Sequence, residues 1–129
     1  MSAELTYLTW ITTLTGLMWI PYILNMIMVR GLLDAVGYPA EPQPLAPWAA
    51  RMKAAHANAI ENLVVFATLV LILQIIGANN AATAAACEVY FWARVVHLLS
   101  YTVRIPWVRT GAFFIGFGAQ MTLAWHILF

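Results

Sequence analysis

The feature that most constrains this chain is a long stretch near its start without any charged side chain, from Leu5 to Val29. An α-helix rises 1.5 Å per residue, so about 20 apolar residues cross the ~30 Å hydrocarbon core of a bilayer. The whole chain is 64% hydrophobic and only 9% charged, whereas soluble domains carry roughly 25% charged residues. We therefore expect an all-α integral membrane protein with a single domain, residues 1–129.

Three further helical segments follow the first one. Proline suits the first turn of a helix, and glycine with asparagine suits a turn, so we expect helices at about residues 5–29, 47–76, 81–103 and 111–129. Pro21 should kink the first of them. Prolines and glycines between Arg30 and Pro47 predict an irregular connector or a lid. No basic segment precedes the first apolar run, so we expect this run to remain as a membrane helix. The prediction is a bundle of four transmembrane helices.

The basic residues predict how the bundle is oriented. Of the six lysine and arginine residues, all but Arg94 lie at or next to the first and third loops. The positive-inside rule places these loops in the cytoplasm and both termini on the outer side. The formal net charge of +1 gives no reason to expect nucleic acid. The single cysteine, Cys87, excludes an internal disulfide and a cysteine-based zinc site, and we expect no metal.

A polar stripe interrupts the third helix. Arg94, His97, Tyr101 and Arg104 are spaced so that they share one helix face. Charged residues inside membrane helices are costly and usually functional. Glu61 on the second helix should reach a depth similar to that of Arg94, so we expect an ion pair between them or a polar ligand shared by both.

These groups predict a polar pocket that opens towards the cytoplasm. Asn58 lies one turn from Glu61, and a basic rim surrounds the opening: Arg51, Lys53, Arg104 and Arg109. A cationic rim above an acid suits a small zwitterion with carboxylates and an ammonium group. The alternative is that the polar groups only satisfy one another and fix helix packing. Glu88 lies away from this pocket, either at the membrane interface or paired with a neighbouring subunit.

Two segments resemble the MAPEG family, the membrane-associated proteins in eicosanoid and glutathione metabolism. Residues 51–62, RMKAAHANAIEN, are similar to the second-helix signature of this family. Arg94, His97 and Tyr101, followed by RTGAFF at residues 109–114, resemble its third-helix and fourth-helix signature. The resemblance covers nearly the whole chain, and the chain resembles the bacterial branch of the family. It implies a multi-pass protein of the bacterial inner membrane with periplasmic termini.

The resemblance also implies a function. It implies a homotrimer that binds glutathione, a cosubstrate, between subunits, and that transfers it to lipophilic electrophiles in the membrane or acts as a peroxidase. Arg109 and Tyr101 would be catalytic, with Arg109 favouring the thiolate. The candidate glutathione-binding residues, including the basic rim, are Arg30, Arg51, Lys53, His56, Asn58, Glu61, Arg94, His97, Tyr101, Arg104 and Thr110.

Two other functions remain open at this point. The first is a non-catalytic binding or scaffold protein with the same fold. The second is a small multidrug-type transporter, which also has about four spans. Such transporters depend on an acidic residue within their first helix, and residues 5–29 contain none. This observation disfavours the transporter.

Overall fold

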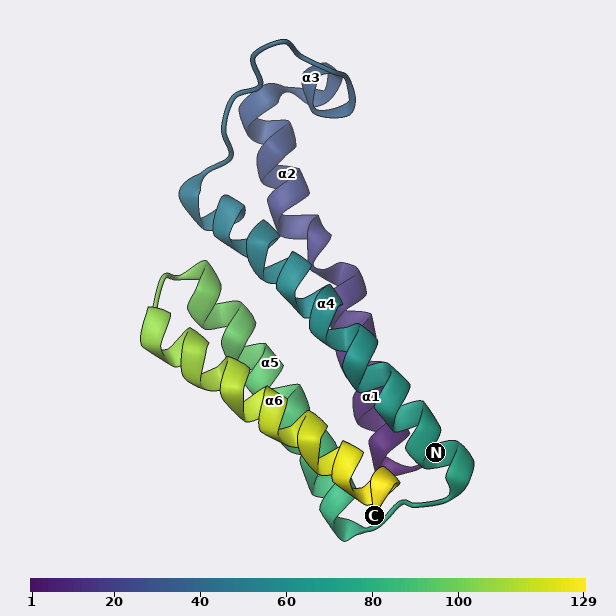
Figure 1. Ribbon diagram of the computed structural model, residues 1–129. Coiled ribbons are helices and arrows are strands. Elements are labelled where there is room, and N and C mark those ends of the chain that lie inside the picture. Colours follow the sequence, from purple (N-terminus) through teal and green to yellow (C-terminus); the bar gives the residue numbers. More distant parts are fainter.

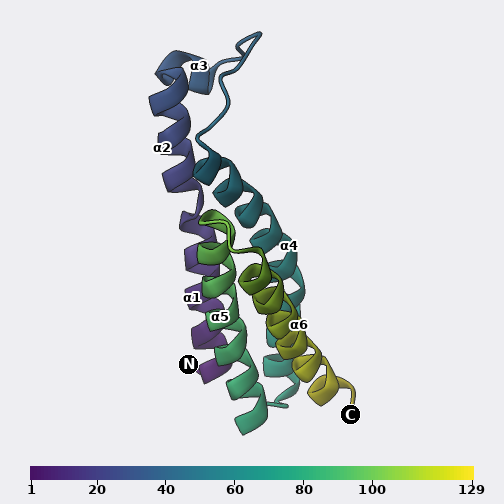
Figure 2. The same ribbon diagram turned by 90° about the vertical axis from the view of Figure 1, so that its left-hand side faces the viewer.

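The computed structural model describes residues 1–129 and consists of helices and loops, without strands. Its six helices are α1 (Ala3–Leu17), α2 (Trp19–Arg30), α3 (Leu32–Val36), α4 (Pro47–Ile76), α5 (Ala81–Thr102) and α6 (Pro106–Leu128). The long helices α1, α4, α5 and α6 run side by side, and both termini lie at one end of the bundle (Figures 1 and 2). The connector from α2 to α4 lies at the opposite end.

The first predicted helix is divided into α1 and α2. Met18 separates them, and its amide contacts the carbonyl oxygen of Thr15 at 3.4 Å. Proline at position 21 removes the hydrogen bond that would reach the carbonyl of Leu17 and crowds that carbonyl. The helix is therefore interrupted close to the predicted position, one turn before the proline that causes the break.

The connector between α2 and α4 contains one short helix that the sequence did not predict. Gly31, at φ 77°, separates this helix, α3, from α2. Side chains of α2 hold the rest of the connector: Arg30 Nε donates to the carbonyl of Gln43 at 2.7 Å, and the amide of Ala46 donates to Asn25 Oδ1 at 3.0 Å. The connector is thus attached to α2 near the point where α4 begins.

The bounds of α4 match the prediction, and those of α5 differ from it by one residue. Gly77 ends α4 in the left-handed conformation, at φ 68°, where glycine carries no Cβ penalty. Asn80 begins α5 with a capping box: its side chain accepts from the amide of Thr83, and the Thr83 hydroxyl accepts from the amide of Asn80.

The last helix begins earlier than predicted. We expected it from residue 111, but α6 begins at Pro106, which occupies its first turn. The turn between α5 and α6 is therefore short, and Arg104 within it has φ 66° and is exposed. Arg109 and Thr110 lie in the first turns of α6 rather than in a loop.

The core of the bundle lies between α4, α5 and α6, with Ile11 of α1 against it. Phe66 and Tyr90 stack with ring centroids 3.8 Å apart, and Leu73 and Leu123 are fully buried beside them. Many large apolar side chains face outward instead, as expected for a surface in contact with lipid.

Three segments are long and apolar enough to cross a membrane: Ala3–Arg30, Pro47–Ile76 and Pro106–Leu128. The 22-residue α5 is long enough but carries Glu88, Arg94 and His97, which lower its hydropathy. In both views α5 lies along the other long helices (Figures 1 and 2). The structure thus supports a helical membrane protein, and the count of four spans depends on α5.

Candidate functional site

Five of the predicted site residues line one pocket. The pocket has a volume of about 170 Å³, and its lining comes from three helices: Asn58 of α4, His97 and Tyr101 of α5, and Arg109, Thr110 and Phe113 of α6. It lies near the end of the bundle that carries the short α5–α6 turn. The early start of α6 brings Arg109 and Thr110 into this pocket, because both side chains project from a regular helix beside α5.

Within this pocket, the guanidinium of Arg109 lies over the aromatic ring of Tyr101. The guanidinium carbon of Arg109 lies 5.0 Å from the centroid of this ring, within the range of a cation–π contact. The ring of His97 meets Tyr101 edge-on at 5.6 Å. Arg109 also lies in the first turn of α6, where the helix dipole adds positive potential. The pocket can therefore stabilise an anion.

Arg94 lies behind this pocket and is only 4% exposed. Its Nη2 donates to Oδ1 of Asn58 at 2.8 Å, and Nδ2 of Asn62 contacts the same oxygen at 3.3 Å. Glu61 is exposed. The prediction of an ion pair between Glu61 and Arg94 is therefore wrong within this chain. The guanidinium of Arg94 donates instead to the neutral amide of Asn58, one turn earlier on α4.

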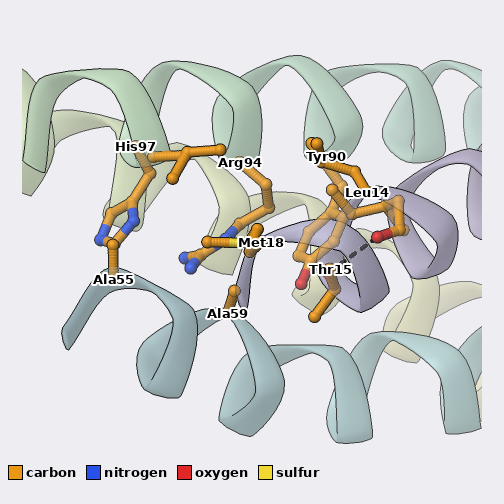
Figure 3. A pocket seen from close by; sticks show the side chains of 10 residues that line it. Leu14, Thr15, Met18, Ala55, Ala59, Tyr90, Arg94 and His97 are labelled. Carbon is orange, nitrogen blue, oxygen red and sulfur yellow. Dashed lines mark hydrogen bonds between the residues drawn. The ribbon is translucent and has the colours of Figure 1, made fainter. Parts of the chain in front are cut away.

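A second, much smaller cavity lies on the other side of Arg94, between α1, α4 and α5 (Figure 3). Its volume is about 10 Å³, close to the room that one water molecule needs. Three buried polar atoms on α5 have no protein partner: Tyr90 Oη, Arg94 Nε and His97 Nδ1. His97 lines both cavities, whereas Arg94 lines only the smaller one and is bonded to Asn58 of the larger one.

The remaining predicted site residues lie outside the larger pocket. Arg51 Nε donates to the carbonyl of Thr102 at 2.9 Å, and His56 Nδ1 shares a 2.7 Å hydrogen bond with the hydroxyl of Tyr22. Arg30 holds the connector. Lys53, Glu61 and Arg104 are exposed. Because α5 ends at Thr102, Arg104 leaves the helix face that Arg94, His97 and Tyr101 share.

Several residues of the two cavities and their surroundings were not predicted, among them four with polar or aromatic side chains. Asn62 Nδ2 donates to the carbonyl of Asn58 at 2.9 Å, and Gln120 supports Asn58 indirectly, since its Nε2 donates to the carbonyl of Asn62 at 3.1 Å. Phe113 lines the larger pocket, and Tyr90 lines the smaller one. Gln120 could have been found, because a buried amide in an otherwise apolar helix requires a partner.

Comparison with known proteins gives a consistent result. The model of the MAPEG family matches residues 7–129. Microsomal glutathione S-transferase 1 of Rattus norvegicus is 29% identical over 79 residues, which are 60% of this chain and 51% of the relative. The proteins of the same name from Bos taurus and Homo sapiens are 30% and 27% identical over the same length. The chain spans about half the length of the curated relatives it matches.

Proposed function

Because this chain belongs to the MAPEG family, we propose that it is a glutathione-dependent membrane enzyme of the transferase or peroxidase type, acting on lipophilic electrophiles. Family membership and the likeness to microsomal glutathione S-transferase 1 support a glutathione-related membrane function. The observation that carries the proposal is the pocket in which Arg109 and Tyr101 meet Asn58 and His97.

The chemistry of the thiol explains why a cation is needed. A free thiol has a pKa near ~8.5, so only a few per cent is ionised at neutral pH, and the thiolate is the nucleophile. A cation within ~4–6 Å in a partly dry site lowers a pKa by about 1–3 units. Arg109 suits this role because a guanidinium does not deprotonate and because Tyr101 fixes its position. Tyr101 and Thr110 supply hydroxyl groups beside it.

The proposed transfer step uses the bound thiolate directly. Its sulfur forms a bond to an electrophilic carbon, the leaving group departs with its bonding electron pair, and the thiol proton has already passed to solvent. Residues of this chain bind and orient the cosubstrate. Asn58 is half-exposed in the pocket and offers its amide, and the exposed Glu61 beside it offers a carboxylate to the ammonium group.

The size of the pocket supports an assembly. About 170 Å³ is less than the ~300–1,000 Å³ typical of small-molecule sites. A neighbouring subunit of the proposed homotrimer would complete the site and could bring basic residues that lie outside the pocket within one chain: Arg30, Arg51, Lys53 and Arg104. With α5 as a fourth span, the proposed topology has periplasmic termini in the bacterial inner membrane.

The test is to titrate the purified protein with glutathione and to follow the thiolate ultraviolet band. We expect a band at neutral pH in the wild type. Arg109→Ala should remove the band while glutathione still binds, because the other contacts remain. Trp107→Ala, an exposed neighbour on the same turn of α6, is the matched control and should keep the band.

Three outcomes would contradict the proposal or part of it. Glutathione that binds to the wild type without ionising would indicate the non-catalytic binding protein instead. Failure to bind glutathione at all would remove the ligand assignment. A band that survives Arg109→Ala would move the activating role to another residue.

A further inference from the structure

A groove on the outer face of α5 and α6 is separate from the pocket described above. Its volume is about 590 Å³, within the range of sites for drug-sized ligands. The lining is mainly aliphatic, with one indole and one carboxylate: Glu88, Val89, Trp92, Ala93, Val96, Val108, Gly111, Ala112 and Ile115. Glu88, Trp92 and Val96 are spaced at i, i+4 and i+8, so they share one face of α5. The buried Arg94 belongs to the opposite side.

The carboxylate in this groove requires a partner. Glu88 is exposed, and Trp92, one turn away, is 54% exposed. Glu88 lies about 21 Å along α5 from its carboxyl end at Thr102, at 1.5 Å per residue. Its distance from the start of α5 at Ala81 is about 10 Å, so with α5 as a span it lies in the outer half of the membrane, where a carboxylate without a counter-charge is costly in the apolar layer.

The lysine and arginine side chains of this protein do not pair with Glu88. Five of the six lysine and arginine residues lie at the other end of the bundle, around the connector and the α5–α6 turn. Arg94 is buried and bonded to Asn58. In a second copy in the same orientation, five of the lysines and arginines again lie at the far end, and Arg94 is again buried. A cationic molecule dissolved in the membrane can supply the counter-charge that lysine and arginine do not.

We propose that this groove is a binding site for lipophilic monocations, with Glu88 as the counter-charge and Trp92 as an aromatic partner. The aliphatic walls bury the apolar groups of such a ligand, and the indole face attracts its cation. The groove continues towards the start of α5 along small side chains, among them Ala85, Gly118 and Ala119, which leaves room for an apolar tail. This site is independent of the thiol chemistry proposed above.

Tetraphenylphosphonium is a suitable probe, because it is permanently charged and lipophilic. Its binding to the purified protein in an uncharged maltoside detergent is measured by equilibrium dialysis. Tetraphenylborate, an anion of similar shape, is the matched ligand control. We expect the cation to bind and the anion not to bind.

The variants separate charge from hydrophobic adsorption. Glu88→Gln should weaken tetraphenylphosphonium binding at least tenfold, and Trp92→Leu should weaken it several-fold. Glu41→Gln removes an equal charge from the exposed connector and should leave binding unchanged. Because Glu88 is exposed, its substitution should not impair folding, which thermal unfolding of the variant checks.

Three results would overturn the proposal. One is equal affinity in Glu88→Gln and wild type. The second is equal binding of tetraphenylborate, which would indicate adsorption to apolar surface alone. The third is displacement of the probe by equimolar phosphatidylcholine, which would assign the groove to lipid headgroups.

Discussion

Replacing Asn58 with alanine tests the contact that holds the buried guanidinium. Arg94 is 4% exposed, and its guanidinium makes one side-chain hydrogen bond, from Nη2 to Asn58 Oδ1 at 2.8 Å. Its Nε has no hydrogen-bond partner. A hydrogen bond to a charged group contributes about 1.5–3 kcal/mol. Asn58 is half-exposed at the pocket, so water can replace part of the lost contact. We therefore expect Asn58→Ala to lower the free energy of unfolding by about 2 kcal/mol.

The matched variant is Asn58→Asp. It keeps the size of the side chain and places a carboxylate against the guanidinium, so the buried charge gains a counter-charge. We expect stability equal to or above that of the wild type. Titration with a denaturing detergent, followed by circular dichroism, measures both variants. If Asn58→Ala unfolds at the same detergent fraction as the wild type, or if Asn58→Asp is the less stable of the two, Arg94 does not depend on this contact.

Three further predictions follow from the fold. A reporter fused after Phe129 should be active in the periplasm, and cytoplasmic activity would contradict the four-span topology. Tyr22→Phe should lower the free energy of unfolding by about 1 kcal/mol, because it removes the 2.7 Å bond to His56; an unchanged thermal midpoint would argue against that bond. Glu61→Gln should leave stability without ligand unchanged, since Glu61 is exposed and Arg94 is bonded elsewhere, and a marked loss measured by thermal unfolding would restore the ion pair.

Much of the helical layout follows from local chemistry and could be predicted. Pro21 marks the break of the first span, Pro47 begins α4, and Gly77 ends it. The start of α6 differs from the prediction because Pro106 both stops α5 from continuing and suits the first turn of the next helix. The five residues of α3 are too few for any periodicity to be detected.

The site was predicted less completely. The spacing of residues along a helix predicts how deep a side chain lies in the bundle more reliably than the direction in which it points. Arg94, His97 and Tyr101 were correctly placed on one face of α5. Their partner on α4 was placed within one turn in depth, but two side chains three residues apart on a helix still differ in direction by about 60° around its axis. Asn58 consequently faces Arg94, whereas Glu61 is exposed. Only the packing of α4 on α5 decides between them.

The unequal lengths of the helices give the molecule two different heights. The first span has 28 residues and α4 has 30, so each extends over about 42–45 Å, whereas α5, with 22 residues, covers only about 33 Å. The projecting ends of α2 and α4 are visible beyond the α5–α6 turn in Figure 1. A bilayer of uniform thickness cannot match the longer helices and the shorter α5 at once. Hydrophobic mismatch is relieved by tilting or by local thinning of the lipid. The thickness of the host membrane will therefore set the inclination of this bundle, and with it how deeply the mouth of the pocket is submerged.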